Sequence, residues 1–262
     1  MRWTPLLLCL LACGDKDAPS DDTAANADDT AVSTDDTADT TETGDTSDTS
    51  DTSDTSDTST ETPLEGFGTL TGDCDMLDTE LSDAGPFLFM NTLDFGDAEF
   101  DYDALSAGGQ EVYDDGNLGG SSLHSEIFAY EVLYRCELAA LIKTEGEITY
   151  VDSGGKKTDL LVEIDGQRIG VSVTRAFAWP PDDPYTVAQA QDLLEDKLAD
   201  VLLSTANVDA SDAWTRQILS VIAYTPDHAA RIEEAWALVD EAVRADTIVY
   251  VTATEGNDEY IY

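Results

Sequence analysis

The stretch Lys156–Ala176, which reads KKTDLLVEIDGQRIGVSVTRA, predicts a β-hairpin from which the rest of the fold can be worked out. Two runs rich in Leu, Val and Ile, Asp159–Ile164 and Arg168–Thr174, are separated by Asp165-Gly166. An Asp-Gly pair between two such runs is a strong signal for a tight hairpin turn, because both turn residues adopt positive φ. A third run upstream, Glu147–Val151, predicts one more strand beside this hairpin.

Helical patterns lie on both sides of the hairpin. Apolar residues recur at helical spacing from about Leu123 to Leu141, and Ser121 or Ser122 can cap the start of that helix. Downstream the expected elements are a helix over Thr186–Leu203, a strand over Ile218–Tyr224, a helix from Pro226 to about Val243 and a strand over Thr247–Thr254. The order α-β-β-β-α-β-α-β predicts an α/β protein with a mixed sheet and helices on its faces.

The folded part is predicted to be a single domain over 64–262, about 200 residues, which is enough chain for one sizeable core. Its first part, 64–120, is rich in Asp and Gly, with scattered aromatic residues and few periodic runs. We expect loops with short strands there, and a better defined core over 121–262.

The element order and the hairpin sequence resemble the core of the restriction-endonuclease-like superfamily, also called PD-(D/E)XK nucleases. In active members an Asp begins the second strand, an acid-X-Lys sequence stands on the third, and a Glu on the first helix often assists. The resemblance implies that two carboxylates hold Mg²⁺ or Mn²⁺ while the lysine orients a water molecule. Asp159 matches the strand-two Asp and Glu126 the helical Glu, with Glu131 as the second choice.

The third strand departs from this pattern. Ser172-Val173-Thr174 stands where the acid-X-Lys sequence belongs. Arg175 follows directly, but successive side chains of a strand alternate between its faces, so it should point the other way. Lys157, or Glu195 and Lys197 on the following helix, could replace the missing groups if these have migrated. The resemblance therefore predicts a degenerate scaffold with a non-catalytic binding or structural role. A metal-dependent nuclease or phosphodiesterase with a rearranged site is the alternative.

Both matched acids also have a plain structural interpretation. Asp159 follows a turn and can cap a strand. Glu126 lies in the first turn of a helix, where the helix dipole favours acidic side chains.

The N-terminal sequence MRWTPLLLCLLACGD resembles the signal peptide of bacterial lipoproteins. Arg2 gives a positive start, Leu6–Leu11 a short apolar run, and Ala12-Cys13 the end of a lipobox. The resemblance implies removal of residues 1–12, lipid on Cys13 and anchoring in the cell envelope. An ordinary signal peptide with a chance cysteine is the alternative. Gly14 rather than Asp after the cysteine favours the outer membrane, and the periplasmic and surface sides remain open.

Residues 13–63 after the signal peptide are predicted to be a disordered linker. This segment is nearly all Asp, Thr, Ser and Ala and includes a Thr-Ser-Asp repeat over Thr46–Ser59. Such a segment buries too little apolar surface to offset its ordering entropy. A low-affinity cation or glycan site on the repeat is the alternative to a plain tether.

The net charge of −44 bears on partners. The linker holds 16 acids and one lysine, so about −30 falls on the folded part. This charge disfavours nucleic acid as a partner. The expected partners are the membrane, through the lipid, and an unknown protein or ligand. Local attraction of nucleic acid is left open by a basic strip that consists of Arg135, Lys143, Lys156, Lys157, Arg168 and Arg175.

The sequence contains four cysteines. Cys9 would leave with the signal peptide and Cys13 would carry lipid, so Cys74 and Cys136 remain. An even pair in an oxidising compartment predicts a disulfide, with two buried thiols as the alternative. No Cys/His metal motif, phosphate loop or dinucleotide fingerprint occurs in the sequence.

Overall fold

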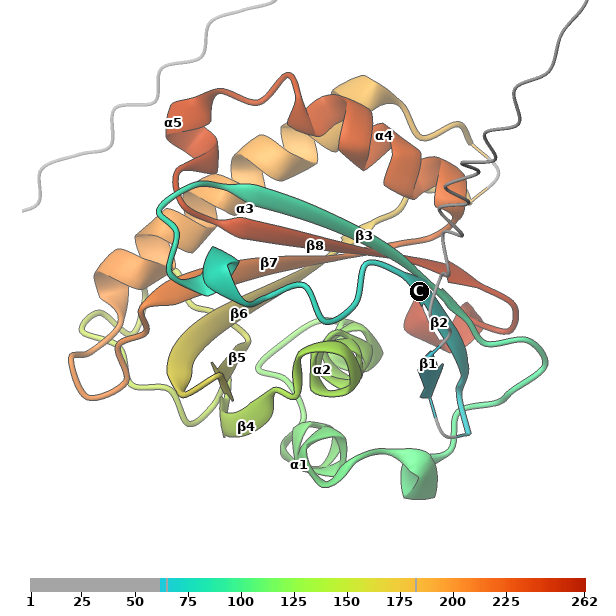
Figure 1. The fold of residues 1–262 in the computed structure, drawn as a ribbon, viewed down its shortest axis with the longest axis horizontal. Coiled ribbons are helices and arrows are strands. Elements are labelled where there is room, and N and C mark those ends of the chain that lie inside the picture. Colours follow the sequence, from blue (N-terminus) through green and yellow to red (C-terminus); the bar gives the residue numbers. More distant parts are fainter. Residues whose placement is uncertain (1–61, 65, 182) are drawn as a thin grey trace, which may run out of the picture. The chain divides into compact units, whose positions relative to one another are not determined.

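An eight-stranded mixed sheet forms the centre of the fold (Figure 1). The structure is a computed structural model that describes residues 62–64, 66–181 and 183–262. The spatial order of the strands is β1-β2-β3-β8-β7-β6-β5-β4. Their bounds are β1 Thr62–Leu64, β2 Gly68–Gly72, β3 Phe87–Asp94, β4 Ala140–Thr144, β5 Leu160–Ile164, β6 Gln167–Ala176, β7 Arg216–Ala223 and β8 Ile248–Glu255.

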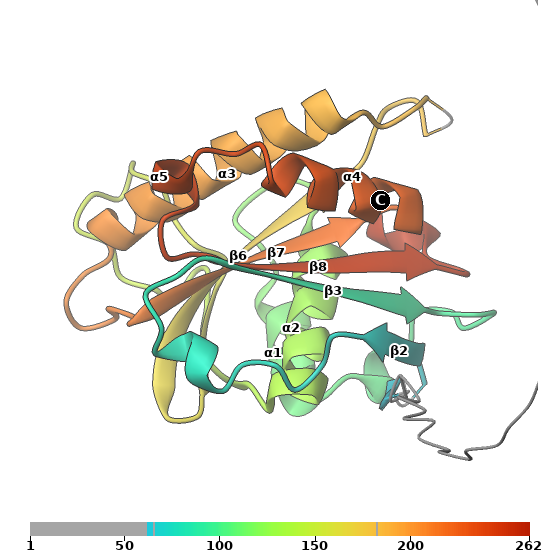
Figure 2. The same ribbon diagram turned by 45° about the horizontal axis from the view of Figure 1, so that its top comes forward.

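The middle of the sheet is parallel and its two ends are antiparallel. β3, β8, β7 and β6 pair in parallel, whereas β1-β2-β3 and β4-β5-β6 pair antiparallel. Figure 2 shows the arrowheads of β3, β8 and β7 pointing the same way. The carboxyl ends of the parallel strands therefore meet at one edge of the sheet.

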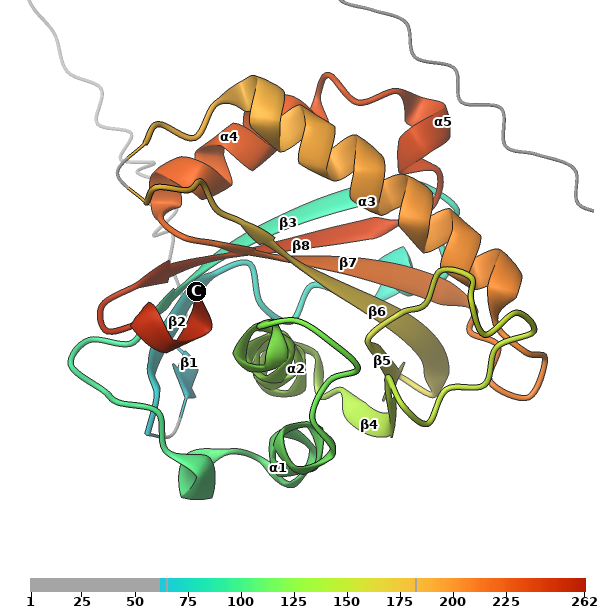
Figure 3. The same cartoon turned by 180° about the vertical axis from the view of Figure 1, so that it is seen from behind.

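Helices cover both faces of this sheet. The helices α3, α4 and α5 lie on one face, and α1 and α2 lie on the other (Figures 1 and 3). Their bounds are α1 Ala107–Asp115, α2 Leu123–Glu137, α3 Val187–Asn207, α4 Pro226–Trp236 and α5 Glu241–Arg244, with short 3-10 turns η1 Thr79–Leu81, η2 Tyr102–Ala104 and η3 Glu259–Ile261.

Among the described residues, one large apolar core lies on each face of the sheet, and Ile148, Leu161 and Trp214 form a small third cluster. On β8, Ile248 and Tyr250 pack toward α2, while Val249 and Val251 pack toward α3 and α4. Every residue of β7 is buried, as expected for a central parallel strand covered on both faces. The sequence-based expectation of an α/β protein with a mixed sheet is therefore right.

The predicted order of helices and strands after Gly120 is found with two differences. The helix expected from Pro226 to about Val243 is divided into α4 and α5, and one strand was misplaced. Glu147–Val151 is not a strand, and the edge strand is β4, which the helical pattern had absorbed. α2 ends at Glu137 because Leu138 adopts a left-handed backbone with φ of 52°. The amide of Ala139 then bonds the carbonyl of Leu133. The hairpin turn is as expected, since Asp165 and Gly166 have φ of 50° and 72°.

The expectation of loops and short strands over 64–120 was wrong in two places. β3 is a full strand of eight residues and pairs with β8 near the middle of the sheet. α1 is a helix although two glycines stand in its first turn. A Cβ on Gly108 would lie 2.2 Å from the Tyr130 hydroxyl, and one on Gly109 would lie 2.1 Å from Glu131 Oε1. Glycine is needed at both positions because α1 packs closely against α2. The low helix propensity of glycine is the reason that the sequence pattern did not predict this helix.

Candidate functional site

Asp159 lies directly before β5, beside the point where β6 continues past the first residue of β5. Its Oδ2 accepts a 2.6 Å hydrogen bond from the amide of Val173. The residue keeps limited solvent exposure, but its carboxyl lies deep among protein atoms. Burial, together with the negative charge of Glu126, raises the pKa of Asp159 to about 7, although the Val173 bond and Lys197 act in the opposite direction. This carboxyl therefore changes charge near neutral pH.

Glu126 is buried in the first turn of α2, with 3% exposure. Its Oε1 accepts hydrogen bonds from Ser122 Oγ at 2.8 Å and from Asn117 Nδ2 at 3.4 Å. Burial raises the pKa of Glu126, and the charge of Glu145 adds to the shift, while the Ser122 and Asn117 bonds oppose it. The charge of Glu126 thus acts on the ionisation of Asp159.

Two further charged groups belong to this cluster. Glu145 follows β4, accepts a 3.0 Å hydrogen bond from the Leu118 amide and raises the pKa of Asp159. Lys197, from α3, favours the ionised form of Asp159. The sequence named Lys197 as a migrated cation but missed Glu145, because that residue was placed just before a strand that does not form. We call Glu126, Glu145, Asp159 and Lys197 the Asp159 cluster.

The third-strand positions contribute hydroxyls to this region. Ser172 Oγ and Thr158 Oγ1 share a hydrogen bond of 2.9 Å. Arg175 reaches the start of α2. It donates to the Ile261 carbonyl at 2.9 Å and to Ser121 Oγ at 3.1 Å, and Ser121 adjoins the Ser122 that bonds Glu126. No carboxylate or amine comes from the positions that carry acid-X-Lys in active nucleases.

The remaining candidates have other contacts. Glu131, fully buried, accepts hydrogen bonds from the amide and hydroxyl of Ser106 at 2.8 and 2.6 Å, so it holds the start of α1. Glu195 accepts a 2.8 Å hydrogen bond from Gln191 on the same helix. Lys157 lies over the ring of Tyr150, 5.8 Å from its centroid.

A tight metal-binding trio does not form around Asp159 in the part of the chain that the structure describes. Elsewhere among the described residues, one group of three acids has carboxylate oxygens within 4.8 Å of one another. It consists of Glu111, Asp115 and Glu147, and all three are exposed. Asp159 and Glu126 are linked instead by the effect of the Glu126 charge on the Asp159 pKa.

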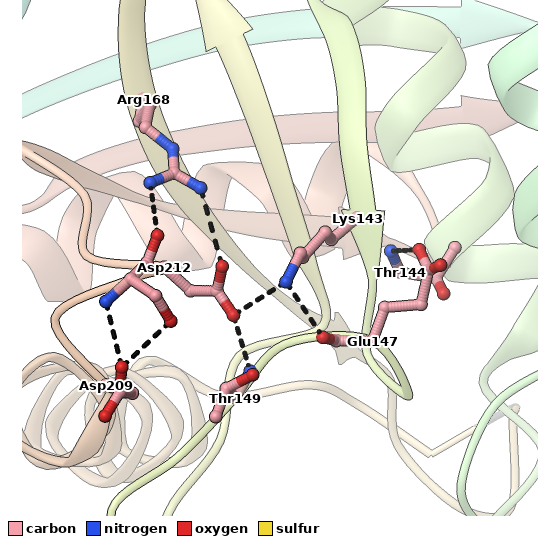
Figure 4. Close-up of polar contacts among 8 residues, drawn as sticks. Lys143, Thr144, Glu147, Thr149, Arg168, Asp209 and Asp212 are labelled. Atoms are coloured by element: carbon pink, nitrogen blue, oxygen red, sulfur yellow. Dashed lines mark hydrogen bonds and ion pairs between the residues drawn. The ribbon is translucent and has the colours of Figure 1, made fainter.

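Asp212 organises a second polar cluster at the β4 edge of the sheet (Figure 4). Its Oδ2 accepts from Lys143 Nζ and from the Thr149 amide, both at 2.8 Å, and Arg168 lies 3.6 Å from Oδ1. Burial acts to raise the pKa of Asp212, but Lys143 and Thr149 outweigh it, and the pKa is lowered. The cluster joins the edge strands to the loop before β7, so its role is structural.

Most side chains of the basic strip form ion pairs with acids of the same protein. Besides the two cations on Asp212, Lys156 pairs with Asp200 at 2.7 Å and Arg135 with Glu131 at 3.5 Å. These four cations are neutralised by neighbouring acids, which leaves little positive surface for phosphates.

Cys74 and Cys136 form a disulfide with an S–S distance of 2.12 Å. It joins the segment after β2 to the end of α2. The neighbouring Glu137 carboxylate reinforces this joint, because it accepts hydrogen bonds from the Leu77 amide at 3.0 Å and from the Tyr250 hydroxyl at 3.0 Å.

The predicted lipidation site Cys13 and the predicted linker lie outside the described residues. Within residues 62–64, 66–181 and 183–262, no helix is long and apolar enough to cross a membrane.

No protein-family profile matches this chain. It is 38% identical over 164 residues to the AAC-rich mRNA clone AAC4 protein of Dictyostelium discoideum, and the match covers 60% of this chain. The chain spans 24% of the length of that relative. Among solved structures it resembles SfsA of Pyrococcus furiosus, determined in complex with Ca²⁺, at 16% identity and a TM-score of 0.27, over 52% of this chain and 57% of SfsA. Neither likeness shows the family or the function of this chain.

Proposed function

We infer that this chain is a lipid-anchored protein of the bacterial cell envelope, with a folded domain that serves binding or structure and performs no nuclease chemistry. The domain is proposed to descend from a restriction-endonuclease-like core, because its order α2-β4-β5-β6-α3-β7-α4-α5-β8 follows the αβββαβ order of that superfamily, with two extra helices and a strand. Export to an oxidising compartment is supported by the disulfide between Cys74 and Cys136.

The main support for a non-catalytic role is the hydrogen bond that Asp159 makes. Its carboxylate caps the Val173 amide of the neighbouring strand. On β6, Ser172 and Thr174 stand at the positions of the acid-X-Lys sequence. They supply neither the second carboxylate nor the amine that hydrolysis of a phosphodiester needs. The partner is proposed to be an unidentified protein or ligand, and nucleic acid is disfavoured by the acidic charge.

Labelling in a bacterial host with a radioactive fatty acid tests the anchor. The wild-type chain should incorporate label and partition into the detergent phase. Cys13→Ala should abolish both, whereas Cys9→Ala, the matched control within the signal peptide, should leave both intact. Labelling of the Cys13→Ala protein would contradict the proposal.

A second candidate function is a metal-dependent phosphodiesterase. The observation that favours it is the raised pKa of Asp159 beside Glu126, Glu145 and Lys197, because strongly shifted groups gather at functional sites. Mg²⁺ keeps several waters and takes one or two carboxylates, so Asp159 and Glu126 are the residues that would hold it. The ion would supply charge stabilisation at a phosphate, and Lys197 would lie nearby.

Calorimetry with Mn²⁺ separates the two candidates. The proteins to compare are the wild type, Asp159→Asn, and Asp192→Asn, in which an exposed acid of α3 is replaced. The first function predicts the same weak heat from all three, which reflects only diffuse binding to surface acids. Saturable micromolar binding that Asp159→Asn abolishes and Asp192→Asn keeps would establish the second.

A further inference from the structure

The chain leaves two neighbouring parallel strands in opposite directions at the carboxyl edge of the sheet. After β7 it turns into α4, on the face covered by α3. After β8 it turns into η3, which packs against α2 on the other face. Figure 2 shows α4 above this edge and the end of the chain beside it. In open α/β sheets such a divergence opens a crevice, and ligands bind there more than anywhere else.

A cavity of about 260 Å³ occupies this position. Residues that follow β7 line one side of it, and residues from the end of β8 line the other. This volume lies below the range of about 300–1,000 Å³ that drug-sized ligands occupy, so the site suits a small molecule or the end of a longer one. We call it the β7–β8 cleft.

The polar groups of the cleft are acidic and neutral. Glu255 is exposed at the rim, whereas Asp258 is buried with 8% exposure. Thr254 Oγ1 donates to Asp258 and also pairs with the Tyr262 hydroxyl at 2.8 Å. Among the residues that the structure describes, no lysine, arginine or histidine lines the cleft. An anion would therefore meet two acids. The charge of Arg175 acts on Tyr262 beside the cleft, but its hydrogen bonds go to the Ile261 carbonyl and to Ser121. The chemistry of the cleft lining therefore favours a cation.

Aromatic rings adjoin these acids. Tyr224 lines the cleft, and its ring lies 4.9 Å from that of Tyr262 and 5.2 Å from that of Phe177. Trp179, next to Phe177 at 6.3 Å, is 80% exposed. Ring faces attract organic cations by about 0.5–2 kcal/mol, which adds selectivity over a bare metal ion.

Two longer-range fields act on the cleft. The positive end of the α4 dipole lies beside it, but Asp227 in the first turn of that helix offsets it. The folded part carries about −30 of charge, and a field of that sign raises the local concentration of cations. Burial raises the pKa of Asp258, and a bound cation would favour its ionised form.

We propose that the β7–β8 cleft binds a small organic ammonium ion, held between the Glu255 and Asp258 carboxylates and the Tyr224 ring. The ammonium group can belong to a free polyamine or to a lysine side chain, since both present the same cation on an aliphatic chain. The site lies between the carboxyl ends of β7 and β8, and β6 separates these strands from β5. It does not depend on the lipid anchor or on metal binding by Asp159.

Calorimetry on the full chain in a non-ionic detergent tests this inference. The probes are 1,4-diaminobutane, the lysine analogue Nα-acetyl-lysine methylamide, and 1,4-butanediol, which matches the diamine in length but carries no charge. The diamine should bind at one site and the diol should not. Binding by the lysine analogue as well would assign the site to protein side chains, whereas binding of the diamine alone would assign it to free polyamines.

Paired substitutions place the binding site on the protein. Glu255→Gln should weaken diamine binding about tenfold, the loss expected for one charge-assisted hydrogen bond. Glu233→Gln removes the same charge from an exposed position on α4 and should change the affinity less than twofold. The linker acids are common to both variants, so the comparison isolates the cleft. Equal effects of the two substitutions, equal binding of diol and diamine, or no saturable diamine binding would each overturn the inference.

Discussion

The carboxylate of Asp159 stands where β5 would otherwise continue along β6, and it satisfies a strand amide that would lack a partner. A neutral acceptor could do the same. The ionised form is costly because the group is buried near Glu126 and Glu145, and Lys197 compensates only in part. The negative charge of Asp159 is therefore not needed for its hydrogen bond with the Val173 amide.

Asp159→Asn should stabilise the fold at high pH. The pKa of Asp159 is 3.8 before the shift and about 7 in the folded chain, so its ionisation disfavours folding. That cost is absent below about pH 4, grows as the pH rises to 7 and is complete above it. Asparagine keeps an acceptor for the Val173 amide. The free energy of unfolding should rise by about 2–4 kcal/mol at pH 8 and change little at pH 4.

Urea unfolding at both pH values measures this difference, with Asp192→Asn as the control for removal of one negative charge. A loss of stability at pH 8 on Asp159→Asn would show instead that the ionised carboxylate has a strong cationic partner.

Residue-level prediction from the sequence succeeded where a local pattern placed the side chain. The hairpin put Asp159 at the start of β5, and the first turn of α2 put Glu126 beside it. Glu145 could not be found in this way, because its position depends on where α2 ends and β4 begins. Neither boundary carries a glycine or proline signal.

At the scale of elements, the end of α2 shows why that boundary was missed. Leu138 ends the helix in a left-handed conformation with its side chain 81% exposed. A leucine in that conformation is strained, and glycine is the usual residue there. The apolar spacing through Leu138 and Leu141 continued the helical pattern although the backbone had already turned.

Leu138→Gly should therefore stabilise the protein. Relief of left-handed strain is worth about 1–2 kcal/mol, and the added freedom of glycine in the unfolded chain offsets about half of it. The net gain in the free energy of unfolding should be about 0.5–1 kcal/mol by urea titration. Leu203→Gly is the contrasting control, because Leu203 is exposed in the interior of α3 and glycine there should cost about 1 kcal/mol. Destabilisation by both substitutions would mean that the Leu138 conformation carries no strain.

At the scale of the whole molecule, the disulfide closes a long loop that begins after β2 and ends in α2. Cys74 and Cys136 are separated by 62 residues, a span that contains β3, α1 and most of α2. Removing the cross-link by Cys74→Ser with Cys136→Ser should lower the free energy of unfolding by about 4 kcal/mol on the loop-entropy account. A reductant should lower the melting temperature of the wild type and leave the double variant unchanged. An unchanged wild-type melting temperature, with both thiols shown to be reduced, would contradict this expectation.

The charge of the whole chain sets a further condition on stability. The folded part carries a net charge of about −30, and most of its acids lie at the surface without a cation in contact. Repulsion between these like charges destabilises the folded state. The Debye length falls from about 30 Å at 0.01 M salt to about 10 Å at 0.1 M, which screens most of this repulsion while leaving buried pairs such as Lys143–Asp212 nearly unchanged.

The melting temperature should therefore rise with added salt, in contrast to a protein held together by surface ion pairs. A gain of about 1–2 kcal/mol corresponds to about 2–8 °C for a domain of this size. The measurement is thermal unfolding in 0.01 M and 0.5 M NaCl at pH 7, repeated near pH 4, where the net negative charge is smaller and the salt effect should shrink. An equal rise at both pH values would point to a general salting effect. A fall at pH 7 would mean that surface pairs such as Lys156–Asp200 contribute more to stability than repulsion removes.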